Sequence, residues 1–181
     1  MESLVYVSEK YIYNLSFFVY KFICYFGEDI DDEYQLLGHF ISPFLYKVYF
    51  LGENFREWYQ PEISGTVNGK ILYGKPDFMV ASGDYEPEIP FFFIQEFKRQ
   101  KTISDPMRQL LAQMATAMEV SKTKEIKGCY NIGRAWYFII LEKISEGKYK
   151  YYESESFDSL KINDLKKIYI YLQAVKHKYC K

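Results

Sequence analysis

The sequence predicts an α/β fold in which a mixed central sheet is flanked by helices. Three features indicate this class. Strand-like segments recur between residues 55 and 98, a well-capped helical pattern follows at 104–120, and further strand and helix patterns complete the chain. The 181 residues are enough for one domain with a substantial core. No internal repeat and no linker rich in Pro and Gly interrupts them, so we expect residues 1–181 to form a single domain.

Two helices are expected before the sheet. Residues 8–26 are apolar on more than one face and predict a first helix. The acidic segment GEDIDDE ends this pattern, and Asp31 or Asp32 can cap a second helix. Pro43 is expected to kink or interrupt that second helix. Its apolar residues recur at helical spacing: Leu36, Leu37, Phe40, Ile41, Phe44, Leu45 and Val48.

The hydrophobic period changes from residue 54 onward. Three segments have the composition of strands: FREWYQPEI (55–63), KILYGKPDFMVA (70–81) and IPFFFIQEFK (89–98). The segments SGTVNG and SGDYEPE separate them and are dense in turn-forming residues. We therefore expect an antiparallel meander of three strands.

A helix with clear start signals follows the meander. Ser104 or Asp105 is the expected N-cap, and Pro106 occupies the first turn. RAWYFIILE (134–142) is almost wholly apolar and predicts a central strand covered on both faces, with GKYKYYESE as its partner strand. A terminal amphipathic helix has Leu165, Ile168, Leu172, Val175 and Tyr179 on one face. The expected order is ααβββαββα.

The charge is divided between the two ends of the chain. Residues 1–96 hold six basic and 15 acidic side chains, whereas residues 97–181 hold 17 basic and nine acidic ones, although the net charge is only −1. Separated potentials of this kind suit a protein that uses carboxylates for a metal and lysines for phosphate. The alternative is that both signs mix on the folded surface.

The cysteine count and the N-terminus suggest a compartment. Cys24, Cys129 and Cys180 are few, odd in number and not spaced as a metal site, which is typical of reduced thiols. The apolar stretch SFFVYKFICYF carries Lys21 and is too short to span a bilayer. We expect a soluble cytoplasmic protein without a membrane partner.

The segment IQEFK carries the candidate chemistry. Strand side chains alternate between faces, so Glu96 and Lys98 point one way while Phe97 points the other. If the second and third strands pair, Asp77 can lie beside Glu96. Two adjacent carboxylates repel each other, and a divalent cation that prefers oxygen, most simply Mg²⁺, relieves the repulsion. The backbone carbonyl of Phe97 can complete the coordination. These groups meet the needs of phosphodiester hydrolysis, with Lys98 facing the phosphate.

The motifs GKPDFMV and IQEFK together resemble the PD-(D/E)xK nuclease superfamily, in which Glu-x-Lys follows a Pro-Asp on the preceding strand. The resemblance implies a restriction-endonuclease-like αβββαβ core with an extra N-terminal and an extra C-terminal helix. It also implies a nuclease that hydrolyses DNA phosphodiester bonds with a water activated by Mg²⁺, with Mn²⁺ as a possible substitute. Asp77, Glu96 and Lys98 would be catalytic, and Asp77, Glu96 and Phe97 would hold the metal.

The resemblance implies further site residues. Many members carry a metal-assisting acid in the first core helix, for which Glu33 is the candidate and Glu28 the alternative. One subgroup has Gln-x-x-x-Tyr in the helix after Glu-x-Lys, and this chain has Gln109 and then Gln113 in place of the tyrosine. Both glutamines could support the active site or hold DNA. The nucleic-acid-binding set is therefore Arg99, Lys101, Arg108, Gln109 and Gln113, although the basic side chains could instead be an ordinary polar surface.

Two other functions remain open at this stage. The chain could be a catalytically inactive member of the fold that binds nucleic acid or a protein partner. It could also be an interaction protein in which the aromatic residues 11–26 form a homodimer. The expected partner is nucleic acid, with DNA favoured over RNA.

Overall fold

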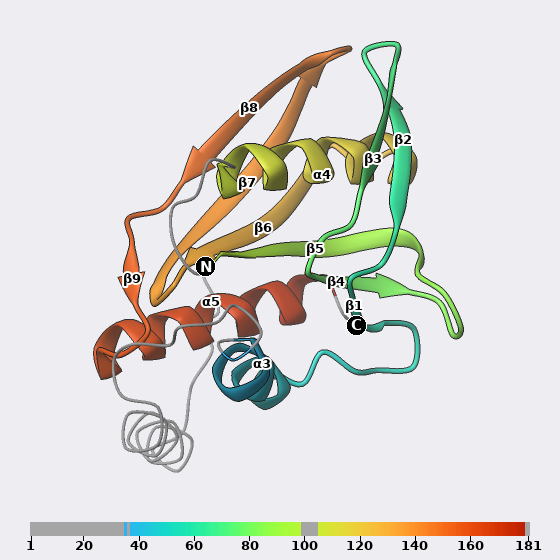
Figure 1. Cartoon of the computed structure of the whole chain (residues 1–181). Coiled ribbons are helices and arrows are strands. Elements are labelled where there is room, and N and C mark those ends of the chain that lie inside the picture. Colours follow the sequence, from blue (N-terminus) through green and yellow to red (C-terminus); the bar gives the residue numbers. More distant parts are fainter. Residues whose placement is uncertain (1–34, 36, 99–104, 180–181) are drawn as a thin grey trace.

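A mixed seven-stranded sheet, covered by helices on both faces, organises the chain (Figure 1). This computed structural model describes residues 35, 37–98 and 105–179. The expected α/β class with a mixed central sheet is confirmed. Several predicted features lie outside the described residues: the helix at 8–26, Glu28, Glu33, Arg99, Lys101 and Ser104.

The strands of the main sheet are arranged in the order β1-β4-β5-β6-β7-β8, and the short β9 pairs with β7. All neighbouring strands are antiparallel except β5 and β6, which run parallel because the helix α4 connects them. The bounds are β1 Arg56–Tyr59, β4 Phe78–Ser82, β5 Glu88–Lys98, β6 Glu125–Ile132, β7 Ala135–Ser145, β8 Lys148–Glu153 and β9 Phe157–Asp158.

A separate two-stranded hairpin corrects the predicted meander. β2 (Ile63–Val67) pairs with β3 (Lys70–Gly74), so the expected strand at 55–63 is divided and the expected strand at 70–81 is two strands in different sheets. Pro76 lies in the break between β3 and β4, where its missing N–H cannot weaken a ladder. Asn68 and Gly69 both have positive φ at the hairpin turn, as a two-residue turn requires. The antiparallel meander is therefore β1, β4 and β5.

The strand β6 was not expected from the sequence. It pairs with β5 over Phe93–Lys98 and with β7 over Ala135–Glu142, which places it at the centre of the sheet. β7 and β8 do form the predicted central strand and its partner.

The helices follow their local signals. A π-helical turn, η1 (Leu37–Ile41), runs into α3 (Ser42–Val48), so the helix changes its geometry next to Pro43, as expected. α4 spans Pro106–Ser121, and Asp105 caps it by accepting the N–H of Met107 at 3.1 Å. α5 spans Ile162–Tyr179. In the part of the chain that is described, no helix is long and apolar enough to cross a membrane.

Two hydrophobic cores lie on opposite faces of the sheet. One is rich in aromatic residues and joins α3 and α5 to Phe78, Phe93 and Phe97. The other joins α4 and the β2–β3 hairpin to Met79 and Ile94. Successive residues of β4 and β5 therefore alternate between the two cores. Figure 1 shows α4 and the hairpin on one side of the sheet and α3 and α5 on the other.

Candidate active site

Strand pairing brings Asp77 and Glu96 together. Phe78 lies opposite Gln95 at the end of the β4–β5 register, so the residue before it, Asp77, lies next to Glu96, whose carboxyl group is affected by the charge of Asp77. Asp77 is half-buried just before β4, whereas Glu96 is completely buried within β5. The predicted meeting of these two carboxylates is therefore present in the structure.

Backbone contacts hold Asp77 in place. The N–H of Phe97 donates to Asp77 Oδ2 at 2.8 Å, and the N–H of Gln60 donates to the Asp77 carbonyl at 3.1 Å. The first bond ties the Asp77 carboxylate to the strand that carries Glu96. In an extended residue the N–H and the C=O point toward the same strand edge, so the Phe97 carbonyl also lies on the edge that faces Asp77.

Lys98 and Gln113 contact the two oxygens of Glu96. Lys98 Nζ lies 3.3 Å from Glu96 Oε1, and its side chain is 17% exposed. Gln113 Nε2 donates to Glu96 Oε2 at 3.1 Å. Glu96, Lys98 and Gln113 meet on the α4 side of the sheet, the side to which Ile94 also points. The alternation that predicted a shared face for Glu96 and Lys98 therefore holds.

The surroundings of Glu96 favour its protonated form. Burial is the largest cause that raises the pKa of the Glu96 carboxyl, and the nearby negative charge of Asp77 adds to it. Gln113 and Lys98 act in the opposite direction, and the resulting pKa is about 7. A carboxyl group with this pKa gains or loses a proton near neutral pH, a property that is common at functional sites.

Gln113 is a site residue whose contact the sequence did not single out. It was grouped with Gln109 as a residue that could support the site or hold DNA. Its exposed fraction of only 4% and its bond to Glu96 favour the supporting role. The helical spacing contained a signal, because Gln113 lies three residues after Leu110 and four before Ala117, both of which are fully buried.

The remaining predicted residues lie on α4 or outside the described chain. Gln109 is half-buried on α4. Arg108 is exposed and forms an ion pair with Asp105, at 3.4 Å, in the first turn of α4. Arg99, Lys101 and Glu33 are outside the described residues.

The oxygen atoms at the site fit a hard divalent cation. Within residues 37–98 and 105–179, no group of three or more His, Cys, Asp or Glu side chains converges. Asp77 and Glu96 supply two carboxylates, and the Phe97 carbonyl supplies a third oxygen. Mg²⁺ is commonly bound by one or two carboxylates and keeps several of its waters, so this donor set is sufficient. Glu96 Oε1 is buried and lies 3.3 Å from Lys98 Nζ, so a cation bound there would share this oxygen with the ammonium group.

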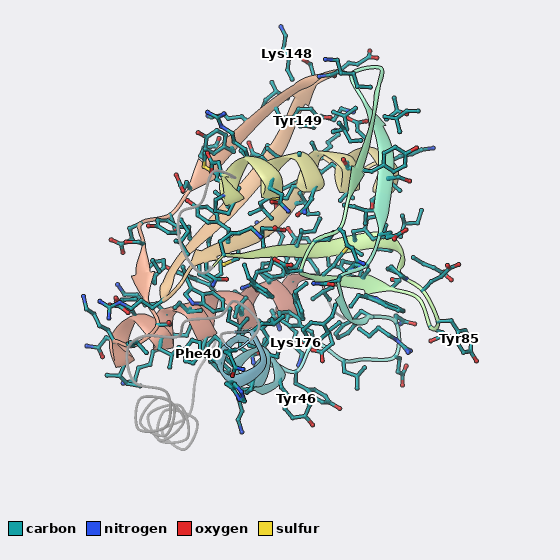
Figure 2. The ribbon with its side chains drawn as sticks, in the orientation of Figure 1. Phe40, Tyr46, Tyr85, Lys148, Tyr149 and Lys176 are labelled. Carbon is teal, nitrogen blue, oxygen red and sulfur yellow. The ribbon has the colours of Figure 1, made fainter. Side chains whose placement is uncertain are left out.

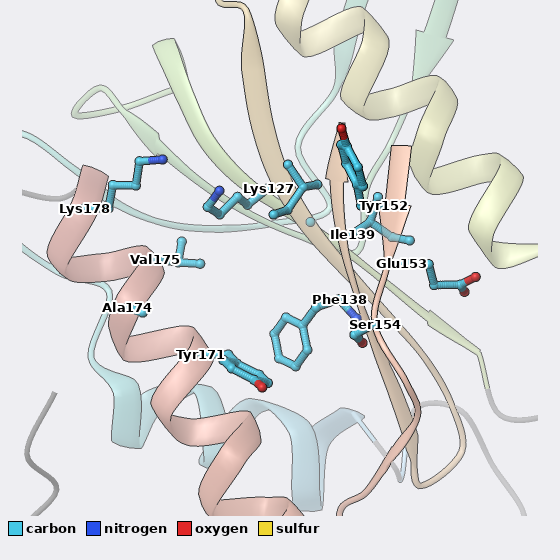
Figure 3. Close-up of a pocket in the computed structure, with 12 residues that line it drawn as sticks. Lys127, Phe138, Ile139, Tyr152, Glu153, Ser154, Tyr171, Ala174, Val175 and Lys178 are labelled. Atoms are coloured by element: carbon cyan, nitrogen blue, oxygen red, sulfur yellow. Dashed lines mark hydrogen bonds between the residues drawn. The ribbon is translucent and has the colours of Figure 1, made fainter. Parts of the chain in front are cut away.

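A cavity of about 420 Å³ lies on the face of the sheet opposite Glu96, between α5 and the strands β6–β8 (Figure 3). Its walls are largely apolar and include Phe138, Tyr171 and Val175. Lys127 and Lys178 also line it, and both contact the Glu125 carboxylate, at 3.0 Å and 2.9 Å. Because these two lysines are paired with Glu125, which does not line the cavity, the cavity lacks the converging acids and base found at Glu96.

Comparison with known proteins does not identify a family. No family profile and no curated protein matches the chain. Among the solved structures that match, "Crystal structure of SSO0001" is 18% identical and covers 98% of this chain and 86% of its own, with a TM-score of 0.28. A TM-score this low carries no argument about fold or function.

Proposed function

We propose that this protein is a metal-dependent nuclease that hydrolyses DNA phosphodiester bonds. The observation that carries the proposal is the meeting of Asp77, just before β4, with Glu96 on the paired strand β5, with the Lys98 ammonium 3.3 Å from Glu96. Two acids and a lysine at the adjoining ends of two interior strands supply the groups that phosphoryl chemistry requires: ligands for a divalent ion and a cation for the phosphate.

The order of elements supports a restriction-endonuclease-like core. α3, β1, β4, β5, α4 and β6 follow each other as αβββαβ, with β6 parallel to β5. The β2–β3 hairpin is then an insertion between the first two strands of this core. Glu96 and Lys98 lie at the end of the third core strand, as the resemblance to PD-(D/E)xK nucleases implies, whereas Asp77 precedes the second core strand and does not end it as expected.

In this proposal, Asp77, Glu96 and the Phe97 carbonyl hold Mg²⁺ or Mn²⁺. A divalent ion bound there supplies charge neutralisation at the phosphate and a bound water of lowered pKa. The Phe97 N–H and the Gln113 amide orient the two carboxylates before the ion binds, which reduces the cost of arranging the ligands. Lys98 is partly exposed next to Glu96, so its ammonium can orient the attacking water or stabilise the charge that develops on the phosphate.

The test is cleavage of supercoiled plasmid and of single-stranded DNA by purified protein, with and without Mg²⁺ or Mn²⁺. We expect cutting that requires the ion and falls by at least about 100-fold in Asp77→Asn, which loses a ligand of the ion, and in Lys98→Ala, which loses the cation that faces the phosphate. Glu88→Gln and Lys70→Ala are matched controls. Both residues are exposed, on β5 and on β3, and both variants should cut like the wild type.

Two results would contradict the proposal. Cutting that persists in Asp77→Asn and Lys98→Ala would place the chemistry elsewhere or in a contaminant. Absence of cutting by a folded wild-type protein that binds neither Mg²⁺ nor Mn²⁺ would favour the alternative of an inactive scaffold. Thermal unfolding of each variant separates loss of chemistry from loss of folding.

A further inference from the structure

The cavity of about 420 Å³ between α5 and the strands β6–β8 lies on the face of the sheet opposite the carboxylate site and has no part in the proposed hydrolysis (Figure 3). The sheet forms its floor. Ile140 of β7 lies opposite Lys127 of β6 and opposite Tyr152 of β8, so these three side chains form a row on the side of the sheet that faces α5. The helix forms its wall, with four lining residues at helical spacing: Tyr171, Ala174, Val175 and Lys178.

The two ends of this cavity differ in polarity. At one end Phe138 and Tyr171 pack edge to face, with their ring centroids 5.2 Å apart. At the other end Lys127 and Lys178 line the cavity, as Figure 3 shows. The Ser154 hydroxyl beside Phe138 accepts from the Phe138 N–H and donates to a backbone carbonyl, so its hydrogen bonds are already made. The cavity is therefore largely apolar along its length and cationic at one end.

The cationic end carries a surplus of positive charge. Lys127 Nζ and Lys178 Nζ lie 3.0 Å and 2.9 Å from the same oxygen, Glu125 Oε1. Burial raises the pKa of the Glu125 carboxyl, but hydrogen bonds from Lys178, Tyr179 and Lys127 outweigh it and lower the pKa to about 2, so this group is ionised at neutral pH. One carboxylate balances only one of the two ammonium groups. The two lysine side chains are 21% and 54% exposed, so an anion can reach them.

The other acids nearby do not cancel this surplus. Glu142 lies opposite Glu125, but it also lies opposite Lys150 on β8, and it does not line the cavity. The Glu153 carboxylate lies on the other face of the sheet, where it accepts a hydrogen bond from the Tyr130 hydroxyl. Among the described residues that line the cavity, the charged side chains that face it are therefore the two lysines.

The walls favour an alkyl chain over a polar ligand. A nucleobase or a peptide segment brings N–H and C=O groups that need partners when they are buried. The strands β6, β7 and β8 already pair their backbone groups with one another, and the lining between the two ends is largely apolar. An alkyl chain needs no such partners. A single negative charge at its end matches the surplus charge of the lysines, which favours a carboxylate over a doubly charged phosphate ester.

We propose that the cavity beside α5 binds a fatty acid, with the alkyl chain between Phe138 and Ile140 of the sheet and α5, and with the carboxylate between Lys127 and Lys178. Ligand cavities in proteins measure roughly 300–1,000 Å³, and this one lies within that range. Each ammonium group has three N–H donors, so both lysines can keep their bond to Glu125 and also donate to the ligand. The proposal does not depend on the nuclease function, because the sheet separates the cavity from the carboxylate site.

The test is isothermal titration calorimetry with decanoate and, as its uncharged counterpart, decanol, both below the concentration at which micelles form and without metal or DNA. We expect decanoate to bind roughly 10- to 100-fold more tightly than decanol, because the alcohol lacks the charged hydrogen bonds to the lysines. Lys178→Ala should weaken decanoate binding by about 10-fold and leave decanol binding unchanged.

Ala174→Trp tests the apolar part of the cavity. Ala174 is exposed on α5 and lines the cavity, so a larger side chain there fills the cavity without entering the core. The variant should weaken the binding of both ligands by at least about 10-fold. Matched controls are His177→Trp, at an exposed position of α5 that does not line the cavity, and Lys148→Ala, at the tip of the β7–β8 hairpin (Figure 2). Both controls should bind decanoate as the wild type does.

Several results would overturn the proposal. Absence of decanoate binding by the folded wild type would exclude the ligand, and equal affinity for decanoate and decanol would show that the lysines do not recognise the carboxylate. Decanoate binding that is unchanged in Ala174→Trp would place the ligand outside the cavity. A wild type that binds no decanoate and forms dimers that Ala174→Trp separates would show that a second copy of the chain covers the cavity instead. Circular dichroism of each variant establishes that it is folded, and DNA cleavage is measured separately, so neither proposal decides the other.

Discussion

Glu96 is the central residue of the proposed site, and its burial costs free energy of folding. A fully buried carboxyl group beside a second acid is expensive to ionise, and this cost appears as a pKa of about 7 compared with an ordinary 4.5. Lys98 and Gln113 offset only part of it. A residue that served stability alone would be better replaced by a neutral side chain. This cost in stability is the expected result if Glu96 is retained for the proposed role in metal binding.

The raised pKa of Glu96 predicts how stability depends on pH in the absence of metal. Between pH 4.5 and 7 the folded protein holds a proton that the unfolded chain has released, so the free energy of unfolding should fall as pH rises through this window. Glu96→Gln should remove this fall and stabilise the protein at pH 8 by on the order of 2 kcal/mol. Urea unfolding at pH 5 and pH 8 in EDTA measures both effects.

The exposed Glu88 provides the comparison on the same strand. Glu88 is exposed, so Glu88→Gln removes a charge of the same sign that is not buried. The free energy of unfolding of this variant should therefore depend on pH as that of the wild type does. If Glu96→Gln and the wild type lost stability in parallel between pH 5 and pH 8, ionisation of Glu96 would not be the cause.

At the scale of elements, the site depends on how closely α4 lies on the sheet. Gly128 of β6 faces α4, and an added Cβ there would lie 2.7 Å from Met114 Sδ and 3.0 Å from the carbonyl oxygen of Ile94. Met114 can adjust its flexible side chain, but Ile94 belongs to the backbone of β5. Because Met114 is next to Gln113, any shift of α4 also changes the hydrogen bond to Glu96.

Gly128→Ala should therefore destabilise the protein by about 1–3 kcal/mol, the usual cost of overpacking a core, and should lower cleavage beyond what unfolding explains. Chemical denaturation gives the first quantity and cleavage at a temperature where the variant is folded gives the second. Gly38→Ala is the matched control, because a Cβ at this exposed position meets nothing within 4 Å. Replacing a helical glycine in open space should be neutral or stabilising by up to about 1 kcal/mol. Equal destabilisation by both variants would contradict the packing argument.

At the scale of the whole molecule, the sequence predicts local structure better than long-range pairing. The Asp105 cap, the helix expected at 104–120 and the alternation at Glu96 and Lys98 depend on neighbours in the chain, and all three are found. The strand β6 was missed because Gly128 and Asn131 interrupt its apolar pattern, although the sheet buries both of them.

Partners that are distant in sequence explain the remaining differences. The division of residues 70–81 into β3 and β4 depends on β4 finding β1 and β5, while β3 pairs with β2 instead. The contact between Gln113 and Glu96 likewise depends on how α4 packs on β5, and no local sequence pattern predicts that packing. The two acids could therefore be proposed from sequence, but the groups that orient them could not.

The site also connects three elements of the molecule, so an ion bound there should stabilise the whole fold. Asp77 precedes β4, Glu96 belongs to β5, and Gln113 on α4 contacts Glu96. A ligand that binds only the folded state at 100 times its Kd adds about 2.7 kcal/mol to the free energy of unfolding. For a domain of this size each kcal/mol corresponds to about 2–4 °C in Tm, so Mg²⁺ or Mn²⁺ should raise Tm by roughly 5–10 °C at pH 8.

The pH dependence of that rise makes the prediction specific to Glu96. Below its pKa of about 7 the carboxyl group holds a proton that the ion must displace, so the increase in Tm should be smaller at pH 5.5 than at pH 8. Asp77→Asn should abolish the increase at both pH values, whereas Glu88→Gln should retain it. Thermal unfolding monitored by circular dichroism measures all of these without any substrate. An equal increase in Asp77→Asn and the wild type would show that the ion binds elsewhere, and the proposed ligand set would then be wrong.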